Sequence, residues 1–283
     1  MSNHEAFIFT PITTVLEEAV SASYVIGNGI ETYALSEYIM NSLFLKMTGF
    51  QEQKMKCIAW EMATYDYEYR RILLQNKDNL GEYSSYKAKS AIYKRLTSLI
   101  ISLNEKFDIS DIDKQQLIDD SLEDIKNIFS NSGLTTWTQK KFNYFVENVI
   151  TNTEQFLMNS DKLFEDLSKK PKKPDESKYD LTNEKGKKAY RKQLEKYENK
   201  LSSFYINTEL NLKIKYEELY NNRNKLAHNT LSYQDNLPSL KALQNESDNS
   251  RNYFVWFFIL VLVDKIFMDL FQKYMAELEE NIF

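Results

Sequence analysis

The residues with the clearest capacity for chemistry lie in one short segment, Tyr216–Tyr233, which reads YEELYNNRNKLAHNTLSY. The chain has only 2 histidines, and one of them, His228, follows Arg223 by five positions in this segment. Histidine titrates near neutral pH, so it can act as a general acid or a general base. Arginine stays charged and donates fork-like hydrogen bonds to phosphate oxygens. These residue types are suited to cleavage of an RNA phosphodiester without a metal ion.

A helix would place these groups unevenly around its axis. Asn224 and His228 are four residues apart and share a face, whereas Arg223 lies about 140° around the axis from His228. One helix therefore cannot bring Arg223 and His228 tightly together. We expect the second histidine, His4, to lie in a loose terminal tail. Because the reaction needs both an acid and a base, one usable histidine per chain predicts a two-fold pairing of two chains.

The string Arg223–His228, RNKLAH, resembles the Rx4-6H motif of the HEPN superfamily. In that family a polar residue, often Asn, follows the arginine, and Ala-His often closes the motif. Members resemble four- or five-helix bundles that dimerise to form a composite site, and many are metal-independent endoribonucleases that act as toxins or in antiphage defence. Some members carry a tyrosine three residues after the histidine, where this chain has Leu231. That departure argues against the nucleotidyltransferase-paired branch of the family.

The resemblance implies that Arg223, Asn224 and His228 form the catalytic set. His228 would be the general acid/base, Arg223 would stabilise the charged phosphate, and Asn224 would orient its neighbours. The implied products are 2′,3′-cyclic phosphate and 5′-OH ends, made without a cofactor or a metal. The implied partners are RNA, a second copy of the chain, and an antitoxin or a defence-system protein.

Two other classes of function remain open at this stage. The first is a non-catalytic helical module that binds RNA or a protein through the same dimer surface. The second is a structural interaction protein whose 19 Tyr and 17 Phe serve core and interface. Titration of His228 distinguishes a nuclease from a binder, since a binder would show salt dependence without product.

The composition excludes several other classes. Of 283 residues, 42% are hydrophobic and 27% are charged, as in soluble globular proteins. A single cysteine, Cys57, excludes an internal disulfide framework, and we expect it to be buried on an apolar stripe. No zinc motif, phosphate loop or nucleophile elbow occurs, and Asp111, Asp113, Asp119 and Asp120 favour helix starts and exposed faces. Without a basic segment followed by an apolar run at the N-terminus, we expect a cytoplasmic protein.

The spacing of apolar residues predicts an all-α fold. The resemblance implies that the helices form a HEPN-like up-and-down bundle, with an additional N-terminal helical region. Three glycines, Gly49, Gly81 and Gly133, each follow a periodic segment and are expected to end helices. The predicted helices cover residues 13–26, 30–48, 51–77, 84–107, 111–130, 135–168, 184–231 and 250–280.

The predicted domains are an N-terminal helical region, 1–134, and a HEPN-like bundle, 135–283, with a basic insertion at 169–200. The insertion contains 12 Lys/Arg and 6 Asp/Glu, a local charge of +6, so the remainder carries −5 − 6 = −11. It is either a solvated surface or an arm that contacts phosphates. The run Tyr253–Val263 is too short to span a membrane, which needs about 20 residues. We expect it to be the central helix of the bundle or part of a subunit interface.

Overall fold

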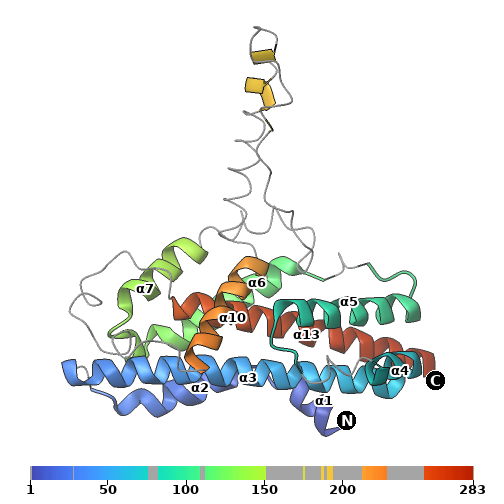
Figure 1. Ribbon diagram of the computed structural model, residues 1–283. Helices are drawn as coiled ribbons and strands as arrows, with labels where there is room; N and C mark the ends of the chain where they lie inside the picture. The colour runs from blue at the N-terminus through green and yellow to red at the C-terminus, as the bar shows by residue number, and fades with distance from the viewer. Residues whose placement is uncertain are drawn as a thin grey trace. The chain divides into compact units, whose positions relative to one another are not determined.

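The computed structural model describes residues 2–27, 29–75, 82–108, 112–150, 175, 186–187, 190–193, 212–227 and 252–282. The described residues form helices and contain no strand, which confirms the all-α class (Figure 1). The N-terminal elements are α1 (Asn3–Ile8), α2 (Thr13–Ala22), the short 3-10 turns η1 (Ser23–Val25) and η2 (Ile30–Thr32), and α3 (Tyr33–Tyr65). Next come α4 (Tyr67–Gln75), α5 (Tyr86–Leu103), α6 (Lys114–Ser130) and the 3-10 turn η5 (Gly133–Thr135). The last are α7 (Gln139–Tyr144), the π-helical segment η6 (Phe145–Ile150), α10 (Leu212–Ala227) and α13 (Tyr253–Ile282).

The chain divides into two compact units, one of residues 1–153 with 216–283 and the other of residues 154–215. The predicted boundary at residue 134 does not coincide with this division. Helix α13 packs against α3, α5 and α6, so the C-terminal helix shares its core with helices from the first half of the chain. Most of the predicted insertion at 169–200 lies outside the described residues.

Helix α13 is the centre of the larger unit. Its apolar run is buried on almost every side, with Phe254, Phe257 and Leu260 fully enclosed. The aromatic ring of Phe129 on α6 stacks on that of Phe257, with ring centroids 5.7 Å apart. The run is thus the central helix of the bundle, the first of the two alternatives predicted for it. Its burial within one chain needs no partner subunit.

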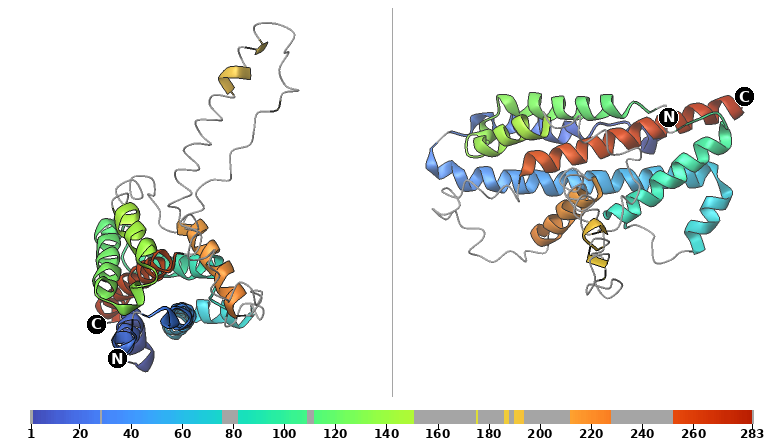
Figure 2. Two further views of the ribbon diagram at one scale, coloured as in Figure 1. Left: turned by 90° about the vertical axis from the view of Figure 1, so that its left-hand side faces the viewer. Right: turned by 90° about the horizontal axis from the view of Figure 1, so that it is seen from above.

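Contacts along α13 give the directions of its neighbours (Figures 1 and 2). Tyr253 donates a hydrogen bond to Asn41, and farther along Gln51 donates to the carbonyl of Leu260 at 3.0 Å, so α3 and α13 run the same way. Helix α6 runs the opposite way, because its last turn meets the start of α13 while Asp124, earlier in α6, pairs with Lys265 at 2.9 Å.

Helix α3 departs from the prediction at two places. It continues without interruption past Gly49, where a helix end was expected, and it ends at Asp66, which was expected inside a helix. Gly49 is exposed, and nothing lies within 4 Å of the position that its Cβ would occupy. The buried residues on both sides of it, Met47 and Met55 among them, hold the helix together because tertiary packing outweighs the propensity of one glycine.

Asp66 separates α3 from α4 through its side chain. Its backbone is extended, and its Oδ1 accepts a hydrogen bond from the backbone N–H of Tyr69 at 3.1 Å, as an N-cap residue does. Its other carboxylate oxygen pairs with Arg95 of α5. The break therefore also ties α4 to α5.

The N-terminal residues are ordered, so the expectation of a loose tail around His4 was wrong. Ser2 and Glu5 form a reciprocal capping box at the start of α1. Nδ1 of His4 lies 3.4 Å from Oε1 of Glu61, and the His4 ring meets the ring of Trp60 edge-on with centroids 5.9 Å apart. The Ser-x-x-Glu spacing that predicts such a cap is visible in the sequence.

Two expectations about single residues are confirmed. Cys57 is buried, as the apolar stripe on α3 predicted. Asp113 caps α6, since its carboxylate accepts a hydrogen bond from the backbone N–H of Gln116 at 2.9 Å. Asp111 lies outside the described residues.

Candidate functional site

The candidate site is centred on the last two turns of α10, where the structure places Arg223 and Asn224. Nη1 of Arg223 donates a hydrogen bond to Oδ1 of Asn224 at 3.0 Å. The amide oxygen of Asn224 therefore faces the guanidinium, which leaves its NH2 group as a donor. His228 lies one residue beyond α10 and outside the described residues. The structure thus brings together two of the three predicted catalytic residues and does not describe the third.

A carboxylate from α3 contributes a contact that the sequence did not reveal. Oε2 of Glu52 lies 3.8 Å from Nη2 of Arg223, and Oε1 of Glu52 pairs with Lys56, one turn farther along α3, at 3.1 Å. The side chain of Arg223 is 26% exposed, so it is not fully enclosed by the protein. A guanidinium has five N–H donors, more than Asn224 and Glu52 can occupy. Arg223 is therefore oriented by the protein and still able to bind an anion.

Tyr216 anchors α10 to the rest of the bundle. Its hydroxyl donates a hydrogen bond to the carbonyl of Ser84 at 3.0 Å and lies 3.3 Å from Oε1 of Gln51. Tyr216 and Leu219 are buried. Arg223 follows Tyr216 by seven residues, which is close to two full helical turns, so both side chains lie on the same face of α10. Gln51 and Glu52 are neighbours on α3, and each contacts one of these two residues.

A fully buried lysine lies next to this anchor. Nζ of Lys89 donates hydrogen bonds to the carbonyls of Tyr83 at 2.7 Å and Ser84 at 3.2 Å, and it lies 5.0 Å from the centroid of the Tyr216 ring. Burial lowers the pKa of Lys89 to about 7, against the raising effect of the Glu52 carboxylate and together with the lowering effect of Arg223. Lysine, glutamate and arginine thus form one electrostatically coupled group.

Burial also raises the pKa of Tyr216, against the lowering effect of the Arg223 guanidinium and together with the smaller raising effect of the Glu52 carboxylate. Its phenol is therefore neutral throughout the range in which Lys89 titrates, and it remains a hydrogen-bond donor. The described residues contain no cluster of three or more His, Cys, Asp or Glu side chains that could hold a metal ion. The groups present at the site can bind an anion and orient it.

Sequence reasoning missed Glu52 and Lys89 for different reasons. Glu52 and Lys56 have the i, i+4 spacing of a helical ion pair, a signal that is visible but common on exposed faces. Nothing in the sequence marks Lys89, because a lysine in a helix is mostly exposed. Only the tertiary structure shows that its ammonium is enclosed.

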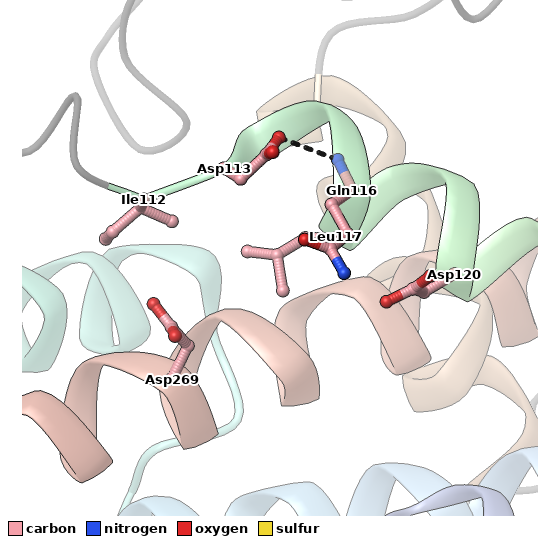
Figure 3. A pocket seen from close by; sticks show the side chains of 6 residues that line it. All are labelled: Ile112, Asp113, Gln116, Leu117, Asp120 and Asp269. Atoms are coloured by element: carbon pink, nitrogen blue, oxygen red, sulfur yellow. Dashed lines mark hydrogen bonds between the residues drawn. The ribbon is translucent and has the colours of Figure 1, made fainter.

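A pocket of ≈ 200 Å³ lies elsewhere, between α6 and α13 (Figure 3). Its lining is formed by Ile112, Asp113, Gln116, Leu117, Asp120 and Asp269. Burial raises the pKa of Asp269. Asp113 serves as the helix cap described above, and no residue of α10 lines this pocket. The pocket is therefore separate from the candidate site.

The part of the chain that the structure describes has no helix with both the length and the apolar character needed to cross a bilayer. No protein-family model matches the chain, and neither the curated proteins nor the solved structures include a significant match.

Proposed function

We propose that this chain is a metal-independent endoribonuclease of HEPN type. The observation that supports it best is the arrangement of Arg223, which is oriented by Asn224 and Glu52, partly exposed, and five residues before His228. A helical chain with this motif agrees with the family resemblance of RNKLAH. Arg223 would bind a nonbridging oxygen of the scissile phosphate.

The proposed reaction is a transesterification. His228 takes the proton of the 2′-OH, the 2′-oxygen forms a bond to phosphorus, and the bond to the 5′-oxygen breaks. A second proton donor protonates the leaving 5′-oxygen, and His228 of a second copy of the chain would supply it. Arg223 stabilises the negative charge that accumulates on the phosphate oxygens. The products are a 2′,3′-cyclic phosphate and a 5′-OH end. A role as a toxin or in antiphage defence follows from the family resemblance alone. A cytoplasmic location is part of the same proposal.

The test is RNA cleavage in EDTA by the wild type and by Arg223→Ala and His228→Ala. We expect the wild type to remain active, and we expect each variant to lose roughly 100-fold or more in rate. Lys225→Ala is the matched control because it removes an exposed positive charge from the same helix. Loss of wild-type activity in EDTA, or full activity in His228→Ala, would contradict this mechanism. A monomeric mass at micromolar concentration would contradict the composite site.

A non-catalytic module that binds RNA or a protein is the second candidate. The observation that favours it is the pairing of Arg223 with Glu52, which reduces the net positive charge at the site. Such a module would bind RNA with a strong salt dependence and yield no cyclic phosphate at any pH. The cleavage assay above therefore separates the two candidates.

A further inference from the structure

Lys89 has an environment that a surface lysine does not have. Its side chain is fully buried, and lysine is almost never fully buried unless its charge is satisfied. Two neutral backbone carbonyls, those of Tyr83 and Ser84, accept its hydrogen bonds. These carbonyls belong to the segment just before α5. The Lys89 ammonium therefore holds that segment against the first turns of α5.

The same carbonyl group connects Lys89 to α10. The oxygen of Ser84 accepts a hydrogen bond from Lys89 Nζ and another from the hydroxyl of Tyr216, and the ammonium also lies over the Tyr216 ring. Tyr216 and Arg223 occupy one face of α10, two turns apart. A change at Lys89 therefore affects Tyr216, which anchors α10, the helix that carries Arg223.

Charge provides a second connection. The groups that act on Lys89 are Glu52 from α3, and Arg223 and Tyr216 from α10. A protonated Lys89 repels the Arg223 guanidinium and attracts the Glu52 carboxylate, so it weakens the pairing of those two residues. When Lys89 is neutral, its ammonium charge no longer draws the Glu52 carboxylate away from Arg223. With a pKa lowered to about 7, Lys89 passes between these states near neutrality.

We propose that Lys89 is a positioning residue whose charge sets how Arg223 is held against Glu52, and hence how Arg223 meets a phosphate. This inference rests on the proposed function for the identity of the anion. The coupling is reciprocal, because two sites that influence each other do so equally in both directions. An anion that binds Arg223 therefore favours the protonated form of Lys89, and its binding strengthens as the pH falls through the titration of Lys89.

The first experiment measures the titration of Lys89 in the full chain by NMR of ¹³C-labelled lysine. We expect a midpoint near 7, an increase of about one pH unit in Arg223→Gln, and a decrease of similar size in Glu52→Gln. Lys225→Gln, which removes an exposed charge from α10, is the control and should leave the midpoint unchanged. An ordinary lysine midpoint, or one that neither Arg223→Gln nor Glu52→Gln moves, would overturn the proposal.

The second experiment measures the affinity for a 2′-O-methyl oligoribonucleotide, which the chain cannot cleave, between pH 6 and pH 8.5. We expect the wild type to lose affinity across this range more steeply than Lys89→Met, by roughly threefold to tenfold. Parallel pH profiles in the two proteins would refute the positioning role. If Lys89→Met does not fold, the titrations in Arg223→Gln and Glu52→Gln still decide the question. A wild type that cleaves no RNA would contradict the proposed function and leave those titrations as the test of Lys89.

Discussion

Arg223 and Glu52, which lie on helices from opposite halves of the chain, approach to 3.8 Å between Nη2 and Oε2. Neither residue is fully buried, and Glu52 also pairs with Lys56. A contact of this kind contributes little to stability, since partly exposed ion pairs are worth at most about 1 kcal/mol. The contact matters instead because it orients the guanidinium of Arg223.

Under the proposed function, Glu52→Ala should therefore reduce RNA cleavage while leaving the fold intact. Release of Arg223 from one of its two partners should lower kcat by between about tenfold and 100-fold, because a small misplacement of a catalytic group is costly. The measurement is kcat with circular dichroism as the check on folding. Glu18→Ala, which removes an exposed carboxylate paired with Lys46 at 3.3 Å, is the matched control. Equal kcat values for Glu52→Ala and the wild type would show that Glu52 does not position Arg223.

The buried Lys89 should make stability depend on pH. Its pKa is lowered from 10.5 to about 7, so between these values the unfolded chain binds a proton that the folded chain has released. The free energy of unfolding of the wild type should therefore rise with pH in this window, by up to about 1.4 kcal/mol per unit, and the penalty of burial is fully present below about pH 7.

Urea denaturation at pH 7, 8 and 9 tests this prediction, since these values lie below the ordinary titration of tyrosine. The contribution of Lys89 is the difference between the slopes of the wild type and Lys89→Met, in which the other titrating groups cancel. A difference of zero would mean that Lys89 keeps its proton in the folded chain across this range.

The ion pair of Lys54 and Asp264 should be essential for stability. The Nζ–Oδ1 distance is 2.6 Å and the side chains are 0% and 1% exposed. The same two groups hold the N-terminal segment, because Lys54 donates to the carbonyl of Thr10 at 2.7 Å and Asp264 accepts from the N–H of Ile12 at 3.0 Å. Asp264→Asn would leave a buried ammonium without its counter-charge, at a cost of about 3–5 kcal/mol.

The control for Asp264→Asn is Asp124→Asn, which breaks the Lys265–Asp124 pair on the neighbouring position of α13. That pair is partly exposed, so its loss should cost about 1 kcal/mol or less. Both values come from urea denaturation at pH 7. Similar losses for the two variants would contradict the special role of the buried pair.

Gly49→Ala should stabilise the chain. Gly49 lies within α3, is exposed, and has nothing within 4 Å of its Cβ position. Alanine restricts the unfolded chain and favours the helix, so the free energy of unfolding should increase by about 0.5–1 kcal/mol. Thermal denaturation measures the change, and a lower melting temperature would mean that the glycine has a further role.

The sequence predicts the helical class correctly, because it depends on apolar spacing. For the Tyr253–Val263 run the sequence left two alternatives, a central helix or a subunit interface, and the structure shows the first. The helix predicted at 111–130 corresponds to α6, and Asp113, one of the residues expected to favour a helix start, caps it through its own side chain. The errors at Gly49 and Asp66 arise where distant packing competes with local preference. The burial of Met47 and Met55 stabilises α3 on both sides of Gly49. The pairing of Asp66 with Arg95 stabilises the break between α3 and α4.

The contacts of the candidate site also divide into local ones, which the sequence indicates, and tertiary ones, which it does not. Arg223 and Asn224 are neighbours in the motif, and their contact follows from their adjacency. Glu52 and Lys89 join them only through the packing of α3 and α5 against α10, which no local pattern records. His4 is a different case, since the capping residues Ser2 and Glu5 that order it are present in the sequence.

The turn of α3 from Gln51 to Lys54 has a consequence for genetics. Glu52 contacts the helix that carries Arg223, Lys54 holds the N-terminal segment and α13, and Gln51 contacts both α10 and α13. Substitutions of Gln51, Glu52 and Lys54 should therefore give similar loss-of-function phenotypes for different reasons. A mutational scan scored by phenotype alone would group these three residues together. Protein abundance measured in parallel would separate the loss of Arg223 positioning at Glu52 from the loss of stability at Lys54.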